Sequence, residues 1–378
     1  MNTVDATLDE LTADPHPLLA AARARSPIAR LPVLDAWIVT SRAAAIDVMR
    51  DPDRFTVDDP RFTTGQIVGP SMLSTDGTEH RRHRDPFSGW FTDRKALSSL
   101  TDWMRATAHD LVADLAPSGA GELRKGLAAP LAAATVVEML GLNPPGHPQL
   151  LAWYQAIVDG VQRLTAGDDA GTAPIAYRRL AAAIHDAVAN RRSDALSHTG
   201  GLSNDEIASN AAVIAFGGIE TSEGAIANAL WHLFSHPETL ERIRADRSSV
   251  SRLVEESFRL EPAAATIDRY ATVDVDLHGA SIRAGDYVIV SLAAANRDPA
   301  VFAAPDRFDL DRANIRTHTT FARGPHACLG IHLARAQAVA AVDAVLDGLP
   351  DAALRADAVG PRGLVFRKAT DVIVEWRT

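Results

Sequence analysis

Hydrophobic residues recur at helical spacing along most of the chain, in long segments rich in Ala, Leu, Arg and Glu. This period predicts helices as the main elements of the fold. Alternating or β-branched stretches are short, and they predict strands at Ala36–Ser41, Val273–Leu292 and Asp371–Trp376. The pattern therefore predicts a mainly α fold, a helical bundle with small antiparallel β-sheets attached.

One predicted helix is apolar on nearly every face. It begins with a capping box at Ser203 and ends before Pro237. Because a helix without a polar face is buried all round, we expect it to be the long central helix of the bundle. Its middle, residues 217–222, nevertheless contains two adjacent glycines, an acid and two hydroxyl side chains. These residues are unfavourable in a buried helix, which indicates either a functional turn or a kink that relieves close packing.

Two breaks rich in Gly, Ser and Asp separate predicted helices, at Thr165–Pro174 and at Arg192–Ser203. Helical character on both sides of each break favours loops inside one domain over linkers between domains. We therefore expect residues 1–378 to form a single domain, with residues 1–14 as a flexible N-terminal extension.

The composition excludes several classes of protein. Hydrophobic residues make up 47% of the chain and charged residues 23%, the balance of an ordinary globular protein. A net charge of −10 without any basic run argues against nucleic-acid binding. The N-terminus lacks a signal-peptide pattern, and the most apolar stretch, Leu127–Leu142, is interrupted and too short for a membrane span. The expected location is the cytoplasm.

The single cysteine, Cys328, excludes an internal disulfide and a cysteine-based zinc cluster. It lies in the segment FARGPHACLG, between Gly324 and Gly330, and Pro325 in this segment lacks a backbone donor. The segment is therefore neither helix nor strand interior. On these residues alone, Cys328 is either a small buried hydrophobe or a group that the glycines allow backbone to approach closely.

A set of motifs, all in the expected order, resembles the cytochrome P450 family. FARGPHACLG is similar to the haem-binding loop of that family, and GGIETS (217–222) to its oxygen-activating helix. The other motifs are HRRHR (80–84), EESFRLEP (255–262), ANRDP (295–299), PDRF (305–308) and GLVFRK (363–368). The resemblance covers about residues 15–376 and implies the cytochrome P450 fold. Two departures are Ala322, where the family commonly has glycine and where we expect alanine to be tolerated, and residues 192–203, which are short for the helix usually found there.

The resemblance implies a haem b cofactor with the Cys328 thiolate as the axial ligand of the iron. The expected cofactor contacts are Gly217, Gly218, Phe321, Gly324, His326, Gly330 and the cations His80, Arg84 and Arg269. His326 and these three cations would bind the propionates, and His318 is a further candidate. Glu256, Arg259 and Arg307 would form a buried ionic triad that supports the cysteine loop and is structural.

Glu220 and Thr221 resemble the acid–alcohol pair that delivers protons for O2 activation in this family. By resemblance the protein is a soluble, bacterial-type haem-thiolate monooxygenase that inserts one oxygen atom from O2 into a small, mainly hydrophobic substrate, in secondary metabolism. The same site also suits oxidative coupling, desaturation, nitration or peroxide-driven oxidation. A haem sensor or carrier without turnover is a third alternative.

The resemblance also implies the partners. Electrons from NAD(P)H would arrive through a ferredoxin reductase and a ferredoxin, and the protein would be a monomer. The expected docking face comprises Arg81, Arg82, Arg323 and Arg335. The expected substrate pocket is lined by the helices that flank Thr165–Pro174 and by Met72, Leu73, Ala263, Ile267, Leu364 and Val365. These positions are apolar, which favours a hydrophobic ligand.

Overall fold

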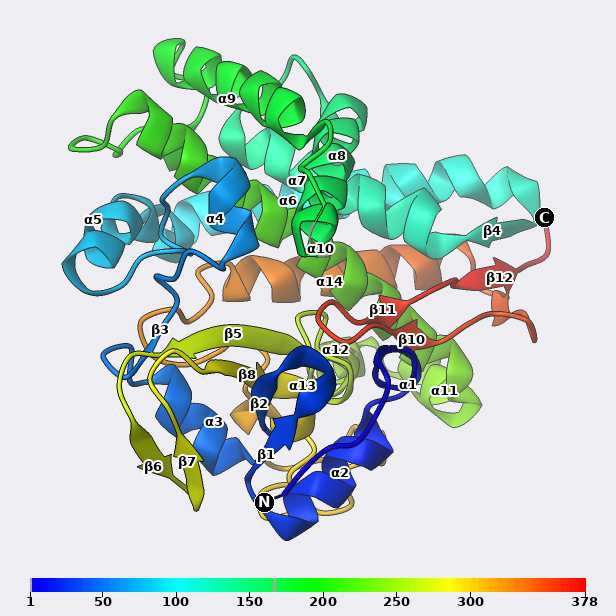
Figure 1. Cartoon of the computed structure of the whole chain (residues 1–378). Helices are drawn as coiled ribbons and strands as arrows, with labels where there is room; N and C mark the ends of the chain where they lie inside the picture. Colours follow the sequence, from blue (N-terminus) through cyan, green and yellow to red (C-terminus); the bar gives the residue numbers. More distant parts are fainter. Residues whose placement is uncertain (1, 166–167) are drawn as a thin grey trace. The chain divides into compact units, whose positions relative to one another are not determined.

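The computed structural model describes residues 2–165 and 168–378, coloured along the chain in Figure 1. They form two compact units. Unit 1 comprises Met1–Thr56, Thr107–Ala128 and Thr221–Thr378, and unit 2 comprises Val57–Ala106 and Ala129–Glu220. Met1 of the expected N-terminal extension, and Ala166 and Gly167 of the expected loop, lie outside the described residues. Helices dominate, as the sequence predicts.

Unit 2 is helical. Its helices are α4 (Thr63–Val68), α5 (Gly77–Ser88), α7 (Ala129–Leu140), α8 (His147–Thr165), α9 (Ala173–Ala189) and the first parts of α6 (Arg94–Leu115) and α10 (Asn204–Ser235). The expected loops connect α8 to α9 and α9 to α10, all inside this unit. The second loop contains a single 3₁₀ turn at Asp194–Leu196 in place of a full helix.

Helix α10 confirms the predicted long, buried helix. Its capping box is formed: the Ser203 N–H donates to Glu206 Oε2 at 2.8 Å, and the Glu206 N–H donates to Ser203 Oγ at 3.2 Å. Most of its residues are buried, and the chain breaks from helical geometry before Pro237. The division between the two units falls within this helix, after Glu220.

The largest sheet lies in unit 1 and has the strand order β1-β2-β8-β5-β3. Its strands are β1 (Ile28–Leu31), β2 (Ala36–Val39), β3 (Phe55–Thr56), β5 (Thr266–Ala271) and β8 (Tyr287–Ser291). β2 and β8 pair in parallel, whereas the other pairs are antiparallel. The sheets are thus antiparallel as expected except for the β2–β8 pair. Parallel pairing needs a long connection, and most of the chain lies between these two strands.

Both faces of this sheet are covered. Trp37 and Val39 of β2 pack in one cluster with Val48 and Met49 of α3 (Arg42–Met49). Ile38 faces the opposite way and packs in a second cluster with residues of α1 (Leu8–Ala13) and α2 (His16–Arg25). Burial on both faces explains why β2 is apolar throughout.

Unit 1 also contains further helices and three small sheets, labelled in Figure 1. The helices are α11 (Pro237–Ala245), α12 (Val250–Leu260), α13 (Leu292–Ala295) and α14 (Ile331–Gly348). The remaining strands are β4 (Ala120–Glu122), β6 (Val275–Leu277), β7 (Ala280–Ile282), β9 (Ala353–Leu354), β10 (Pro361–Arg362), β11 (Lys368–Ala369) and β12 (Ile373–Glu375). They form three small antiparallel sheets, β4-β12-β9, β6-β7 and β10-β11. All three stretches predicted as strands contain strands.

The N-terminal residues are packed and do not form the expected flexible extension. Leu11 of α1 is fully buried, and Val4 is buried with it in the second cluster. The Val4 N–H donates to the Arg30 carbonyl at 2.8 Å, beside a parallel bridge between Thr3 and Arg30. The apolar residues among the first 14 are sufficient to anchor this segment to the sheet.

Candidate functional site

The cysteine loop, residues 321–330, precedes α14 in unit 1. Cys328 is exposed, and its N–H donates to the Phe321 carbonyl at 2.9 Å, which closes the loop. Gly324 has φ +79°, and a Cβ there would lie 2.4 Å from the Met49 carbonyl oxygen, so only glycine fits. The loop thus presents its thiol in an exposed position, and the alternative of a small buried cysteine is wrong.

Two small residues of the loop have different roles. Ala322 has φ +55°, in the left-handed region that favours glycine. A backbone of this kind costs a residue with a Cβ about 1–2 kcal/mol, so the expected tolerance of alanine here comes with strain. At Gly330, an added Cβ would lie 3.9 Å from Cys328 Sγ, which is ordinary contact. A methyl group at Gly330 would therefore touch the sulfur without displacing it.

A buried carboxylate on α12 supports the cysteine loop. Glu255 accepts hydrogen bonds from His318 Nε2, at 3.0 Å, and from Arg335 of α14. The Arg335 guanidinium also lies 5.0 Å from the centroid of the Phe321 ring. Burial raises the pKa of Glu255, but these hydrogen bonds outweigh burial and hold that pKa at about 2. His318 is buried in this pair, so the structure does not support it as a propionate contact.

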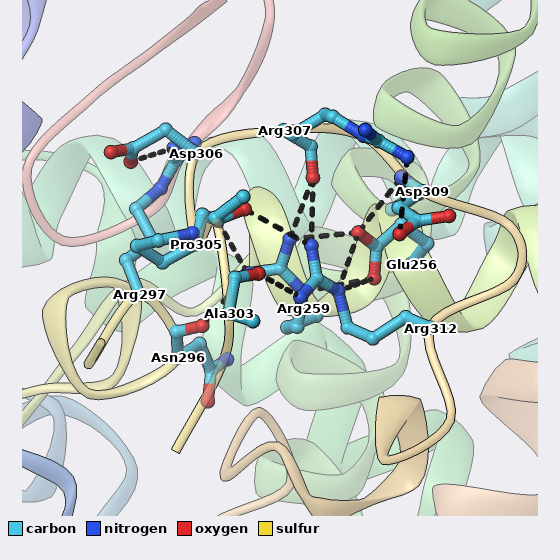
Figure 2. Close-up of polar contacts among 12 residues, drawn as sticks. Glu256, Arg259, Asn296, Arg297, Ala303, Pro305, Asp306, Arg307, Asp309 and Arg312 are labelled. Carbon is cyan, nitrogen blue, oxygen red and sulfur yellow. Dashed lines mark hydrogen bonds and ion pairs between the residues drawn. The ribbon is translucent and has the colours of Figure 1, made fainter. Parts of the chain in front are cut away.

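The Glu256–Arg259 pair lies at the centre of a second buried network (Figure 2). Arg259 donates to both carboxylate oxygens of Glu256, at 2.8 and 2.7 Å, and neither side chain is exposed. Arg259 also donates to the Asn296 and Pro305 carbonyls, at 2.9 and 2.7 Å. The bidentate pair holds the Arg259 guanidinium in place, and its bonds to these two carbonyls fix α12 to the irregular segment that follows α13.

The third member of this triad is Arg312, and the prediction of Arg307 is wrong. Arg312 Nε lies 3.0 Å from Glu256 Oε1, and its side chain is 4% exposed. The Arg307 side chain is 72% exposed and turns toward Asp309, while its backbone carbonyl accepts from Arg259 and Arg312 (Figure 2). A turn, in which the Arg312 N–H donates to the Asp309 carbonyl at 3.3 Å, leads into Arg312, whose side chain reaches the carboxylate.

The four expected propionate cations lie in both units. In unit 1, Arg269 is buried on β5 and donates to the Asp268 carbonyl at 2.6 Å, and His326 is half-buried in the cysteine loop. In unit 2, His80 is buried and Arg84 half-buried, one turn apart on α5. Each pair is therefore carried by a single unit, and the binding of propionates by these four residues stays a prediction.

The two glycines of α10 differ in their surroundings. A Cβ added at Gly217 would meet nothing within 4 Å. A Cβ added at Gly218 would lie 2.9 Å from Val136 Cγ2, a side chain of α7. Gly218 is therefore required by the close packing of α7 and α10, and its role as a cofactor contact stays a prediction. Gly217 retains the open side that such a contact needs.

The acid and the alcohol that follow are consecutive residues of α10. Glu220 is 7% exposed and accepts a hydrogen bond from the hydroxyl of Tyr154 on α8. Thr221 is half-buried. Tyr154 belongs to none of the motifs, so this contact could not be predicted from the sequence. A buried carboxylate with a hydroxyl donor can hold a proton or release it, which is the chemistry expected of a relay.

A further buried network of unit 2 connects α5 to α10. Asn210 of α10 bonds His83 Nδ1 at 2.8 Å, and its Oδ1 accepts the Met72 N–H at 2.8 Å. Burial lowers the pKa of His83. No motif points to Asn210 or His83 as partners, although an Asn amid the apolar residues of a helix indicates a buried partner.

Four of the six residues expected to line a substrate pocket belong to unit 1. The Ala265 N–H donates to the Val365 carbonyl and the Arg367 N–H to the Ala263 carbonyl, both at 2.8 Å. This short bridge joins the segment of Ala263 to that of Val365, which is 45% exposed. Ile267 and Leu364 pack against different apolar clusters of unit 1. Met72 and Leu73 belong to unit 2, where Met72 is buried.

Unit 2 has a small apolar pocket of its own. The helices α8 and α9, which flank the expected loop, contribute Leu150, Tyr154, Ile157 and Leu180. The other lining residues come from α4 and α10, and they are Thr64, Val68, Ala212, Val213, Ala215 and Phe216. The pocket accordingly agrees in its chemistry with a hydrophobic ligand.

The expected docking cations are mostly engaged in internal contacts. Arg82 pairs with Glu79 and Glu206, and Arg335 pairs with Glu255. Arg323 donates to the His318 carbonyl at 2.9 Å. Arg81 is exposed and donates to Thr78 Oγ1 at 3.2 Å. A partner protein that binds these arginines would compete with their contacts inside the chain.

Comparison with known proteins identifies the class. The family model "Cytochrome P450" matches residues 178–347. Cytochrome P450 monooxygenase PikC of Streptomyces venezuelae is 32% identical, over 94% of this chain and 88% of its own length. Vitamin D(3) 25-hydroxylase of Pseudonocardia autotrophica is 30% identical, over 94% of this chain and 91% of its own length.

Solved structures of other proteins are similar to this fold over nearly the whole chain. CalO2 has a TM-score of 0.88 at 28% identity, with 100% of this chain and 99% of that chain covered. P450BioI, solved in complex with hexadec-9Z-enoic acid ligated acyl carrier protein, has a TM-score of 0.88 at 26% identity, with 98% and 99% covered. Relatives named as a monooxygenase and a hydroxylase, which align with most of this chain, support an oxygen-incorporating oxidoreductase. The chain belongs to the cytochrome P450 family.

The cofactor of this family is haem, and the residues present fit it. Cys328 supplies an exposed thiol on a loop that its hydrogen bonds hold in place, and Gly217 supplies a helix surface without a side chain. Buried or half-buried cations suited to carboxylates are present in both units. Among the described residues, 2–165 and 168–378, no helix is long and apolar enough to cross a membrane.

Proposed function

We propose that this protein is a haem b-dependent monooxygenase that inserts one oxygen atom from O2 into a small, mainly hydrophobic organic molecule, in secondary metabolism. The observation that carries the proposal is the exposed Cys328 thiol on a loop fixed by Gly324 and by the buried Glu255 pair. Relatives named as monooxygenases and hydroxylases, such as the mycinamicin IV hydroxylase/epoxidase of Micromonospora griseorubida, support it.

Bound through a Cys328 thiolate, haem supplies an electron-rich iron that activates O2. Phe321, Gly324 and Gly330 shape the loop that holds the sulfur. His80, Arg84, Arg269 and His326 bind the propionates by charge-assisted hydrogen bonds, each worth about 1.5–3 kcal/mol. The triad of Glu256, Arg259 and Arg312 keeps α12 and the segment before the loop in place and takes no part in the reaction.

Glu220 and Thr221 control proton delivery in this proposal. The buried Glu220 carboxylate takes up a proton at one of its oxygens and passes it on. The Thr221 hydroxyl, next along α10, orients the group that receives it. General acid–base residues of this kind contribute about 10²–10⁴-fold to the rate. Their positions on one rigid helix support the assignment.

The substrate and electron partners complete the proposal. Met72, Leu73, Ala263, Ile267, Leu364 and Val365 form the apolar lining that binds the substrate. Electrons pass from NAD(P)H through a ferredoxin reductase and a ferredoxin. Arg81 and Arg323 are the cations of the docking face, because Arg82 and Arg335 are held in carboxylate pairs. The protein acts as a monomer.

The thiolate assignment is tested by spectroscopy. Reduced wild-type protein under carbon monoxide should show the red-shifted Soret band of a thiolate-bound haem, and Cys328→Ser should lose it, because a serine oxygen does not donate in the same way. Identical spectra would overturn the assignment.

The reaction is tested by isotope labelling. A substrate found by its Soret shift should acquire one ¹⁸O atom from ¹⁸O₂ when NAD(P)H, reductase and ferredoxin are supplied. Label taken up only from hydrogen peroxide, or oxidation without label, would instead indicate peroxide-driven or coupling chemistry. A haem protein that consumes no NAD(P)H with any ligand would be a sensor or carrier.

A further inference from the structure

Tyr154 of α8 contacts the proposed acid directly. Its hydroxyl donates to Oε2 of Glu220 on α10. The two side chains are 6% and 7% exposed, and both belong to unit 2. A hydrogen bond from a hydroxyl to a carboxylate is strong, and burial strengthens it further.

The ring of Tyr154 has little freedom to move. Its centroid lies 5.9 Å from that of Phe216, which stands one turn before Glu220 on α10, and the two rings are tilted by 53°. Leu150, Ile157 and Leu180 line the same apolar pocket as both rings. A closely packed aromatic ring keeps its rotamer, so the position of its hydroxyl is fixed by the packing.

We propose that Tyr154 is the positioning residue for Glu220, a proposal that rests on the proton-delivery role assigned to Glu220 above. Glutamate has three side-chain torsions, and a fixed donor at Oε2 selects one orientation of the carboxylate. Without the hydroxyl, the buried carboxylate would turn toward other donors. Tyr154 itself exchanges no proton with substrate in this proposal and acts through Glu220.

The neighbouring helix offers a matched control. Tyr177 of α9 is half-buried in unit 2; burial raises the pKa of its hydroxyl, and nearby Ser209 of α10 lowers it. Tyr177→Phe therefore removes the same atom from a tyrosine near α10, but at a position on this helix away from Glu220. An effect of Tyr154→Phe that Tyr177→Phe lacks is specific to the carboxylate.

The first measurement does not depend on turnover. Infrared difference spectra of purified haem protein, wild type minus Tyr154→Phe, should show a shifted carboxylate band. The difference between Glu220→Gln and the Glu220→Gln/Tyr154→Phe double variant should lack that band. The Glu220 carboxylate is absent from both of these samples, and every other carboxylate is the same in both. Tyr177→Phe should give no such band. Absence of the band in the Tyr154→Phe difference would overturn the proposal.

The second measurement is coupling, the product formed per NAD(P)H consumed. Tyr154→Phe should lower it by about 10-fold with little change in KM, a smaller loss than the roughly 10²–10⁴-fold effect of removing a general acid. Glu220→Asp, which keeps Tyr154 but withdraws the carboxylate by one methylene, should give a similar loss, and it serves as the second variant if Tyr154→Phe does not fold. Wild-type coupling in both variants would overturn the proposal.

Failure of the proton-delivery role and failure of the positioning role give different combinations of results. If Glu220→Gln and Thr221→Ala couple like wild type while the infrared band still shifts, Tyr154 positions Glu220 but the proton-delivery role is wrong, and the proposal falls with it. If both uncouple and Tyr154→Phe does not, the proton-delivery role stands and the positioning role alone is overturned.

Discussion

Gly217 and Gly218 are adjacent on α10, yet a methyl group added at each position would meet different surroundings. At Gly217 it would extend into open space, and at Gly218 it would press on Val136 of α7. One motif thus contains two glycines with different roles. Gly217 leaves open space beside the helix, whereas Gly218 allows α10 to pack closely against α7. The sequence alone shows two identical residues.

Alanine substitutions should separate these roles. Gly217→Ala should raise the free energy of unfolding by up to about 1 kcal/mol, because alanine favours helix. Gly218→Ala should lower it by about 1–3 kcal/mol through overpacking against Val136. Denaturant titration of both variants measures the two changes. Equal changes would contradict the assignment.

Ala322 allows a complementary test at the cysteine loop. Its φ of +55° is unfavourable for any residue with a Cβ. Ala322→Gly should therefore stabilise the folded protein, by about 1 kcal/mol once the greater chain entropy of glycine in the unfolded state is counted. Thermal unfolding followed by circular dichroism should show a higher Tm. A lower Tm would mean that the Ala322 methyl group contributes more by packing than it costs in strain.

Two adjacent carboxylates of helix α12 bind side chains of two different parts of the chain. Glu255 binds His318 and Arg335 at the cysteine loop, whereas Glu256 binds Arg259 and Arg312. Neighbouring residues of a helix point about 100° apart, so one helix can fix two segments that lie on different sides of it. The loop and the segment before it therefore share one support.

Arginine substitutions test which residue completes the triad. Arg312→Ala should lower the free energy of unfolding by about 3–5 kcal/mol, because it removes a partner of a buried carboxylate and the donor to several carbonyls. Arg307→Ala is the matched control and should stay within about 0.5 kcal/mol, because its side chain is exposed. Both variants should be compared by urea unfolding and by yield of haem-loaded protein. The reverse order of effects would restore Arg307 to the triad.

At the scale of the whole molecule, the predictable features were the local ones. The capping box at Ser203, the strand at Ala36–Val39 and the helix α10 each depend on residues close together in the sequence. Arg312 and Glu256 lie 56 positions apart, and Tyr154 and Glu220 lie 66 apart. Nothing local distinguishes Arg312 from Arg307, so only the folded chain could show which of them reaches the carboxylate.

The stability of the chain should depend on pH through buried groups. His232 bonds Ser257 at 2.9 Å and stacks on Phe308, and burial lowers its pKa from 6.5 to about 3. Between these values the unfolded chain binds a proton that the folded chain does not, so the free energy of unfolding falls as pH drops from 6.5. Glu255, with its pKa held at about 2 against 4.5, adds a further loss between pH 4.5 and 2.

Denaturant titrations between pH 7.5 and 4 measure this dependence. His232→Gln should reduce the slope by up to about 1.4 kcal/mol per pH unit, because the glutamine does not titrate. Ser257→Ala removes the hydrogen-bond partner and no titrating group, so it should lower stability at every pH and retain the slope. An unchanged slope in His232→Gln would assign the pH dependence to other groups.

The exposed position of the only sulfhydryl in the chain has a practical consequence. An alkylating reagent such as a maleimide can attach through a thioether at one atom per molecule, so a mass increment of one label reports on Cys328 alone. Sulfur bound to a metal is a poor nucleophile toward such reagents. Under the proposed ligation of haem by Cys328, the labelled fraction of a preparation counts the molecules without ligated cofactor. Oxidative cross-linking of this protein can produce disulfide-linked pairs of chains but no larger disulfide-linked species.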